Sequence, residues 1–253
     1  MKKLGSILFM AAGIFLFTGC GPDQREIQRA SVHHGLGYNY LQQGDPTAAL
    51  REFLEAENLN PKDAQIQYAL GLALNAKGRY LEALEHYKQA SLLDPKYTEV
   101  HNAMGATYLE IGKWDDAIQQ FNLVLKDILY LTPFYVLNNL GWAYYKKGDL
   151  PQAIENYRRA LGMKPDFGLA HYNLGLAYRD NKQTDQAIAA FSRATSLAPN
   201  FMDAHFQLAK LYFDVGRKKE AQKSFEEVVR LAPQSETARL SQQYLDLLKK
   251  STK

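Results

Sequence analysis

The sequence predicts an all-α solenoid of six helical hairpins, followed by a C-terminal capping helix. A proline recurs at multiples of 34 residues, apart from one offset of two, at Pro61, Pro95, Pro165, Pro199 and Pro233. Alanine and aromatic residues recur in register with these prolines, and 46% of the 253 residues are hydrophobic, which is enough for a buried core. A period of this length is typical of stacked helical pairs.

The chain begins with a segment that predicts export. Lys2 and Lys3 form a positive start, residues 4–17 are apolar but too short to span a bilayer comfortably, and small residues follow. We therefore assign residues 1–19 to a signal peptide and exclude them from the fold. Residues 20–29 are expected to hold a lipid-modified cysteine and a short linker.

The end of this segment, Phe17-Thr18-Gly19-Cys20, resembles a bacterial lipobox, which directs lipid attachment to the cysteine and cleavage before it. Cys20 is the only cysteine, which fits a modification site and excludes an intramolecular disulfide. An ordinary secretory signal with an unmodified cysteine is the alternative. In lipoprotein sorting, Asp after the cysteine retains a protein at the inner membrane. Gly21 stands there instead, so the resemblance implies a lipid anchor at the periplasmic face of the outer membrane.

The charge of the exported chain is balanced. Without residues 1–19 it has 28 basic and 27 acidic residues. Such balance gives no electrostatic footprint for nucleic acid, so no nucleic-acid partner is expected. A membrane-binding patch of Lys249, Lys250 and Lys253 is an alternative use of the C-terminus, but a solvated tail is the commoner interpretation.

The recurring proline, placed at position 32, divides the chain into six repeats. Position 8 is Gly in five of them, position 20 is Ala in all six, and position 24 is Phe or Tyr in all six. The alanine lets the two helices of a repeat cross closely, and the ring fills the space beside them. The repeats are residues 30–63, 64–97, 98–133, 134–167, 168–201 and 202–235, and only the third is longer than 34 residues. This pattern resembles the tetratricopeptide repeat family, which implies a right-handed superhelical solenoid.

Glycines mark the end of each first helix. A left-handed backbone is expected at position 15, where five repeats have Gly44, Gly78, Gly112, Gly148 and Gly216. Repeat five has Asn181-Lys182, and we expect Asn181 to take the left-handed conformation, because Asn tolerates it better than other non-glycine residues. After Pro233, apolar residues at helical spacing predict a capping helix within residues 236–253; they are Leu240, Tyr244, Leu247 and Leu248.

The third repeat breaks the period within residues 125–135, LKDILYLTPFY. Four residues are added before Leu131-Thr132-Pro133, compared with the other Leu-x-Pro endings, and two are missing after it. Four residues advance a helix by about 400°, close to one turn. The second helix of repeat three is therefore predicted to continue to about Tyr130, and the stacking angle of repeat four is expected to change.

The histidines recur in register but do not predict a metal site. His33, His101, His171 and His205 all occupy position 4, and successive copies in a stack lie too far apart to share an ion. A zinc site needs three or four ligands within about 2.3 Å of the metal. We expect these residues to pack, with no metal and no cofactor. The sequence also lacks HExxH, a phosphate-binding glycine loop and a nucleophile elbow, so no enzymatic activity is expected.

A binding groove is predicted on the first helices. Positions 2, 5, 9 and 12 share one face, opposite the packing stripe of positions 4, 7, 8 and 11, and in tetratricopeptide arrays this face lines the concave surface. Aromatic anchors are typical of peptide-binding surfaces, although some of these rings are expected only to cover neighbouring helices. The family's carboxylate clamp is not matched, because Asn139 and Asn173 lack its accompanying lysines. The predicted groove is lined by Tyr38, Tyr68, Tyr135, Trp142, Tyr145, Tyr172, Phe206 and Phe213, with Asn75, Asn102, Asn138 and Arg179.

A lipobox, six tetratricopeptide repeats and a longer third repeat together resemble the type IV pilus biogenesis lipoproteins that act as secretin pilotins. The resemblance implies a lipid-anchored scaffold that binds the outer-membrane secretin and helps it reach its membrane and assemble. A periplasmic adaptor that docks peptidoglycan hydrolases or proteases is the alternative, and an envelope enzyme is disfavoured. The sequence leaves the bound segment and the oligomeric state open.

Overall fold

The computed structural model describes residues 22–250 and shows thirteen α-helices there. The signal peptide, Cys20 and residues 251–253 lie outside the described residues. Each repeat contributes a first helix, called the A helix, and a second, called the B helix. The A helices are α1 Gln24–Gln42, α3 Ala64–Ala76, α5 Thr98–Glu110, α7 Pro133–Lys147, α9 Gly168–Asp180 and α11 Met202–Asp214. The B helices are α2 Pro46–Leu59, α4 Tyr80–Leu93, α6 Trp114–Val124, α8 Leu150–Met163, α10 Thr184–Leu197 and α12 Lys218–Leu231, and α13 spans Glu236–Lys250.

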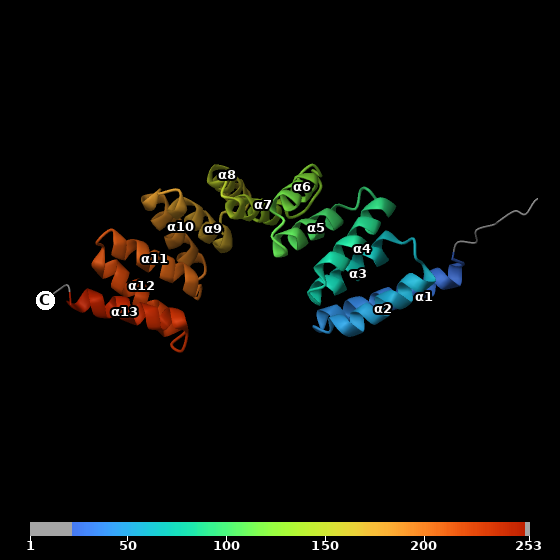
Figure 1. Ribbon diagram of the computed structural model, residues 1–253, viewed down its shortest axis with the longest axis horizontal. Helices are drawn as coiled ribbons and strands as arrows, with labels where there is room; N and C mark the ends of the chain where they lie inside the picture. The colour runs from blue at the N-terminus through green and yellow to red at the C-terminus, as the bar shows by residue number, and fades with distance from the viewer. Residues whose placement is uncertain (1–21, 251–253) are drawn as a thin grey trace, which may run out of the picture.

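The helices stack into an arch, with the first and last helices at its opposite ends (Figure 1). Each A helix packs against its own B helix and, from repeat two on, against the B helix of the preceding repeat. Consecutive A helices also contact each other, as between α5 and α7, more than consecutive B helices do. The A helices therefore lie on the inner side of the curve. The predicted all-α solenoid is confirmed.

One contact recurs through the core, between the residue at position 8 of the A helix and the ring at position 24 of the B helix. A Cβ added to Gly71 would lie 2.4 Å from the Tyr87 ring, and one added to Gly141 would lie 2.7 Å from the Tyr157 ring. Carbon atoms do not approach so closely, so glycine is required where the ring lies flat against the backbone. Position 20 is a fully buried alanine in every repeat.

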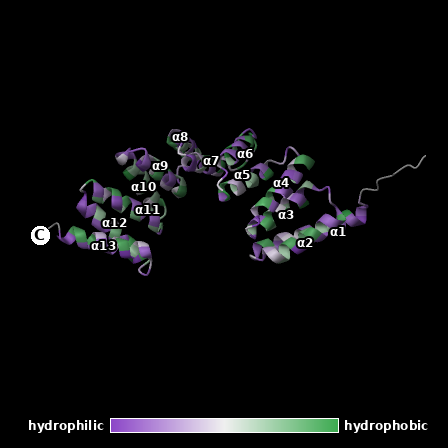
Figure 2. Cartoon of the chain, viewed as in Figure 1, coloured by the Kyte–Doolittle hydropathy of each residue, from purple (hydrophilic) through white to green (hydrophobic). Residues whose placement is uncertain are grey.

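Apolar stripes on the helices face their neighbours and merge into five buried clusters along the arch. Figure 2 shows hydrophobic and hydrophilic residues alternating around each helix, as expected for helices that are buried on one side. At the C-terminal end, the Tyr244 ring of α13 stacks on Phe225 with 4.8 Å between centroids, and Leu245 and Leu248 are buried. The predicted capping helix therefore shields the last repeat. The predicted stripe is wrong in two members, because Leu240 and Leu247 are 41% and 53% exposed and Leu245 packs in their place.

The turns between A and B helices follow the expected pattern with one correction. Each of the five glycines at position 15 has a positive φ, between 72° and 86°. In repeat five the prediction for Asn181 is wrong: its φ is −83°, and Lys182 takes the left-handed conformation with φ 59°. The hairpin geometry fixes the left-handed residue at position 15, and this outweighs the preference of Asn for that conformation.

The predicted extension of the second helix in repeat three is also wrong. Helix α6 ends at Val124, and residues 125–132 form a connection of two turns, compared with residues 60–63 between α2 and α3. Asp127 stabilises the turn that follows the helix, because its carboxylate accepts hydrogen bonds from the backbone N–H of Leu129 and from the Thr98 hydroxyl, at 2.9 and 2.7 Å. Pro133 is the first residue of α7, where proline is favoured, so it does not match the prolines that follow other B helices.

Replacing Lys182 by glycine should stabilise the fold. A side chain in the left-handed region is strained by about 1 kcal/mol or more, and glycine removes that strain. We expect Lys182→Gly to raise the free energy of unfolding by about 0.5–1 kcal/mol in urea titrations, after the entropy cost of glycine in the unfolded chain. Asn181→Gly is the matched control and should lower stability, because Asn181 has an ordinary φ. A loss of stability in Lys182→Gly together with a gain in Asn181→Gly would contradict the assignment of the left-handed conformation to Lys182.

The buried hydroxyl of Tyr157 offers a second test. Tyr157 is fully buried and its Oη has no hydrogen-bond partner, whereas the Tyr87 hydroxyl at the same position of repeat two bonds to Thr107. An unsatisfied buried hydroxyl costs about 1–3 kcal/mol. Tyr157→Phe should therefore raise the unfolding free energy by about 1 kcal/mol, while Tyr87→Phe should lower it by a similar amount. Equal losses in both variants would show that Tyr157 has a partner.

Candidate functional site

The predicted groove residues lie on the A helices, but the structure exposes them unequally. Tyr135 is the most open of the rings, with 47% of its surface exposed. Asn138 is only 4% exposed and is therefore a buried residue rather than an open contact. The remaining members are half-buried: Tyr38, Tyr68, Asn75, Asn102, Trp142, Tyr145, Tyr172, Arg179, Phe206 and Phe213.

In the N-terminal half, the rings are held by other aromatic side chains. Tyr38 packs edge-on against Phe53, at 5.5 Å between centroids, and Tyr68 lies 5.1 Å from Tyr97, which precedes the next A helix. Burial, together with nearby Tyr38 and Glu99, raises the pKa of Tyr68 to about 12, so its hydroxyl stays protonated at neutral pH. These rings combine a packing role with a partly open face.

Near the crown of the arch, α7 presents a stacked pair of rings. Trp142 and Tyr145 lie 5.2 Å apart with an interplanar angle of 21°, and the ammonium of Lys146 is 5.5 Å from the Trp142 ring. The Tyr145 hydroxyl donates a 2.5 Å hydrogen bond to Asp180 at the end of α9. Burial and this carboxylate raise the pKa of Tyr145 to about 12. The pair is thus fixed in place before any ligand arrives.

A chain of polar contacts continues from this pair toward the C-terminus. Arg179 donates to Asp180 at 2.7 Å and to Gln207 of α11 at 2.7 Å. Burial alone would raise the pKa of Asp180, but the hydrogen bonds from Arg179 and Tyr145 outweigh it and hold that pKa below its usual value. The charge of Arg179 is therefore already neutralised within the protein, which leaves the stacked rings as the main feature offered to a ligand.

Asparagines link neighbouring repeats beneath the rings. The side-chain amide of Asn173 donates to Asn138 Oδ1 at 3.0 Å, which explains why Asn138 is buried. One repeat earlier, Asn102 Oδ1 is buried without a partner. In repeat two, Asn75 donates to Thr107 of α5 at 2.5 Å. The Asn173–Asn138 and Asn75–Thr107 bonds hold adjacent A helices in register.

Sequence reasoning missed a second aromatic group at the start of α7. The rings of Phe134, Tyr135 and Phe167 contact one another at centroid distances of 4.4–5.9 Å. Lys164 lies above them, with its Nζ 5.0 Å from the Phe134 ring. Only Tyr135 was predicted. The other two rings occupy positions 1 and 34. Tyr97 and Phe201 also occupy position 34, and each packs on the A helix of its own repeat, against Tyr68 and Tyr172, so this register was the available signal for Phe167.

The histidines at position 4 make hydrogen bonds within the array. His33 pairs with Glu52 and His101 with Gln120, each at 2.8 Å and each across one helical hairpin. His171 and His205 instead bond to the carbonyl oxygens of Pro165 and Pro199 at 3.0 Å. Among residues 22–250, no three His, Cys, Asp or Glu side chains are grouped closely enough to hold a metal ion.

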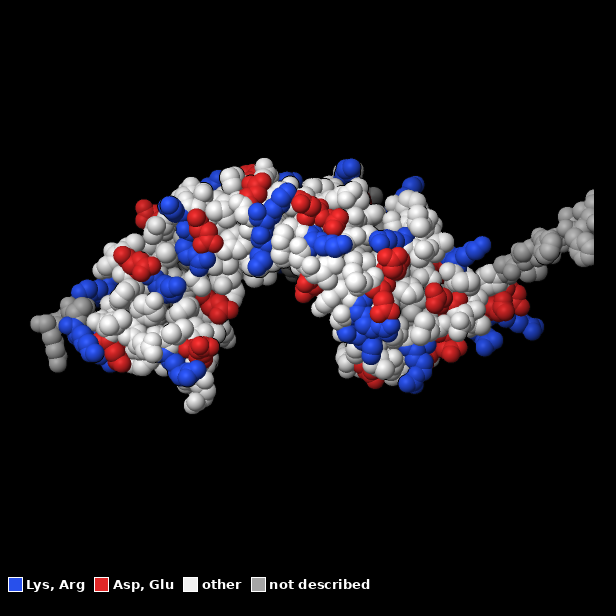
Figure 3. All heavy atoms as spheres, in the orientation of Figure 1, with Lys and Arg blue, Asp and Glu red and all other residues white. Residues whose placement is uncertain are grey.

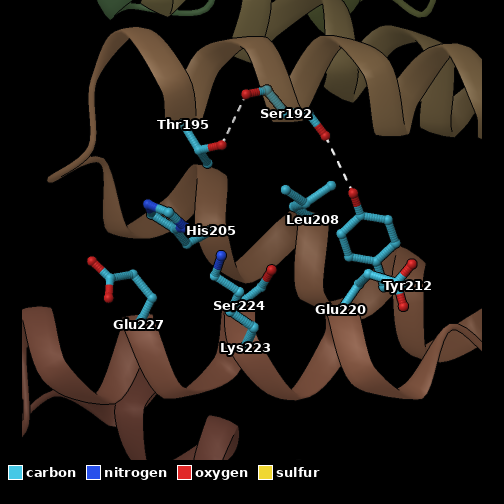
Figure 4. A pocket seen from close by; sticks show the side chains of 9 residues that line it. All are labelled: Ser192, Thr195, His205, Leu208, Tyr212, Glu220, Lys223, Ser224 and Glu227. Carbon is cyan, nitrogen blue, oxygen red and sulfur yellow. Dashed lines mark hydrogen bonds between the residues drawn. The ribbon is translucent and has the colours of Figure 1, made fainter.

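Two clefts lie away from the predicted groove, between consecutive B helices. One, of about 530 Å³, lies between α10 and α12 above α11 and is lined by His205, Tyr212, Lys223 and Glu227 among others (Figure 4). The other, of about 450 Å³, takes the equivalent place between α2 and α4 above α3. Because both occupy the same place relative to the repeat, we attribute them to repeat stacking. The concave aromatic face is an open surface and contributes no residue to either cleft.

Charges do not concentrate on the visible face of the arch. Figure 3 shows Lys and Arg interspersed with Asp and Glu, with uncharged surface between them. Several of these charges pair within one helix, as do Lys88 with Glu85 and Arg217 with Glu220. Within the described part of the chain, no helix is both long and apolar enough to cross a membrane.

The arch resembles several solved structures. PilF of Pseudomonas aeruginosa superposes with a TM-score of 0.75 at 19% identity, over 87% of this chain and 99% of that chain. PilW, described as a widely conserved type IV pilus biogenesis factor, gives 0.78 at 20% identity, over 84% and 98%. YrrB, described as having an unusual peptide-binding site, gives 0.60 at 19% identity, over 76% and 97%. At these identities the likeness shows the fold alone. No curated protein matches the chain.

Family profiles agree with the repeat boundaries in outline. Profiles described as tetratricopeptide repeat match residues 138–201 and 178–244, and one described as TPR repeat matches residues 37–78 and 71–112. Together these spans cover residues 37–112 and 138–244, well over half of the chain. They carry the same glycines, alanines and rings that form the recurring core contact. The chain therefore belongs to the tetratricopeptide repeat family.

Proposed function

We propose that this protein is a lipid-anchored scaffold of type IV pilus biogenesis, which binds the outer-membrane secretin through its concave face and assists the localisation and assembly of that channel. It is not an enzyme in this proposal. Lipid on Cys20 holds it at the periplasmic face of the outer membrane, and the groove takes a segment of the partner protein.

The concave face of α7 carries the binding part of the proposal. Trp142 and Tyr145 are stacked and fixed by Asp180, so they offer a rigid apolar surface that loses little entropy on binding. Central tryptophan and tyrosine residues are common hot spots in protein interfaces. Since Arg179 and Asp180 neutralise each other, the surface favours a ligand segment with apolar or aromatic side chains over a strongly charged one.

The pilus part of the proposal rests on a likeness of the whole array. The fold matches PilF and PilW over 98–99% of their chains. YrrB has the same fold under an unrelated description, so the fold by itself does not select the pathway. The lipobox resemblance at Phe17-Thr18-Gly19-Cys20 supports an outer-membrane site of action.

Removal of the Trp142 ring tests the groove. We expect Trp142→Ala to weaken binding of the secretin at least tenfold, about 1.4 kcal/mol, in a calorimetric titration. Trp142 also packs partly against the core, so a modest loss of thermal stability is expected. Tyr80→Ala is the matched control, because Tyr80 begins a B helix and lies outside the predicted groove. Unchanged binding with a steep loss of stability would show that Trp142 serves packing alone.

Replacement of Cys20 tests the anchor. Cys20→Ser should move the protein from the membrane fraction to the soluble periplasmic fraction, because stable attachment requires acyl chains. Fractionation followed by immunoblotting measures the change, with Ser6→Ala as a control in the same terminal segment. Retention of Cys20→Ser in the membrane fraction would refute lipid anchoring at this residue.

A pull-down with the lipidated protein tests the choice of partner. The secretin should be recovered from envelope extracts with the unaltered protein and be depleted with Trp142→Ala. Deletion of the gene should reduce secretin multimers on gels. Recovery of peptidoglycan hydrolases or proteases in place of the secretin would support the periplasmic adaptor and contradict the pilus assignment.

A further inference from the structure

The connection between α6 and α7 exposes three aliphatic side chains almost completely. Ile128 is 93% exposed, Leu129 81% and Leu131 92%, which are the highest values of any large hydrophobic residue that the structure describes. Leaving aliphatic side chains of this size in water is unfavourable relative to burying them. We call residues 125–132 the apolar loop. The insertion in repeat three therefore produces a protruding apolar surface where other repeats have a short turn.

The apolar loop is held in shape by its own contacts. Asp127 accepts hydrogen bonds from Thr98 and from the N–H of Leu129, and the Tyr130 N–H donates to the Asp127 carbonyl at 3.2 Å. Leu125 and Tyr130 pack on the cluster around Phe121 and Val136. The base of the loop is thus buried while its three aliphatic side chains face solvent, so the loop meets a partner without first becoming ordered.

The surroundings of the apolar loop suit a bilayer surface. The Asp127 carboxylate is occupied within the protein, whereas Lys126 beside it is exposed. Lys164 lies over Phe134 and Tyr135 next to the loop. Aliphatic side chains that enter the acyl region, with aromatic rings and lysines at the headgroup level, are the arrangement found in proteins that bind membrane interfaces.

The N-terminal segment of the chain also favours a membrane as the occupant of the apolar loop. Residues 4–17 are an apolar segment of the kind that directs a chain to a membrane, and the cap of α1 at Asp23 follows Cys20 by three residues. The chain enters α1 at the end of the A helix that, in later repeats, receives the connection from the preceding B helix. The apolar loop is that connection for α7.

We propose that the apolar loop inserts into the surface of a phospholipid bilayer and seats the array on the membrane, as a second attachment beside the N-terminus. The proposal rests on the membrane location in the proposed function. A second copy of this chain, or another protein with an apolar groove, is the competing occupant. Insertion is driven by the aliphatic side chains, so it does not require anionic lipid.

The test uses a chain from Pro22 to Lys253, which lacks both the signal segment and Cys20. This chain keeps the reciprocal cap of α1, in which Asp23 and Glu26 bond each other's backbone N–H, and every described helix. Flotation with vesicles of phosphatidylcholine alone, and of phosphatidylethanolamine and phosphatidylglycerol at 3:1, gives the partition coefficient. The loop variant carries Ile128→Ser, Leu129→Ser and Leu131→Ser. The matched control carries three aliphatic replacements at exposed positions elsewhere: Leu81→Ser, Val215→Ser and Leu247→Ser.

We expect the unaltered chain to float with both kinds of vesicle, the loop variant to bind at least tenfold more weakly at an unchanged melting temperature, and the control to bind as before. Equal binding by the loop variant, or binding to anionic vesicles alone, would overturn the proposal. A third result would also overturn it: the unaltered chain does not bind vesicles but self-associates in sedimentation, and the loop variant does not self-associate. Neither the secretin nor lipid on Cys20 takes part, so failure here leaves the proposed function to its own tests.

Discussion

The array depends on the contact between a ring at position 24 and a backbone without a side chain at position 8. Phe53 lies against Gly37, and the equivalent pairs follow in repeats two to five. The contact sets the distance between the A and B helices of a repeat, and the fully buried alanine at position 20 allows their crossing. Repeat six has Ala209 in place of glycine, with Phe225 buried beside it and Tyr244 of α13 stacked on Phe225.

The parts of the fold that recur were predictable from the sequence, because they follow from local chemistry at fixed positions. The rings, the alanines and the glycines at position 15 each have one physical role and occupy one register. Two expectations failed where a residue has more than one role. Pro133 was matched to the prolines that follow B helices, but it begins α7. Asn181 was preferred on propensity, but the turn requires the left-handed residue at Lys182.

The candidate site was predictable only in outline. The face of each A helix could be identified from helical spacing, and Trp142, Tyr145 and Tyr135 lie on it. The burial of Asn138 could not be identified, because its partner Asn173 belongs to the next repeat, and analysis of one helix does not show contacts between repeats. The contact between Phe134 and Phe167 was also concealed, because the two residues lie at opposite ends of repeat four in the sequence. The exposed loop in repeat three was concealed by the assumption that an added turn continues a helix.

Contacts in this protein join helices that are close in sequence. Each helix packs on the helices next to it in the sequence. The more extensive contacts of an A helix extend at most to the next A helix. Low contact order of this kind permits rapid folding, since few long loops must close before contacts form. A chain that emerges N-terminus first can therefore complete each hairpin on the one before it. Helix α13, at the far end, is the last element to cover an open apolar face.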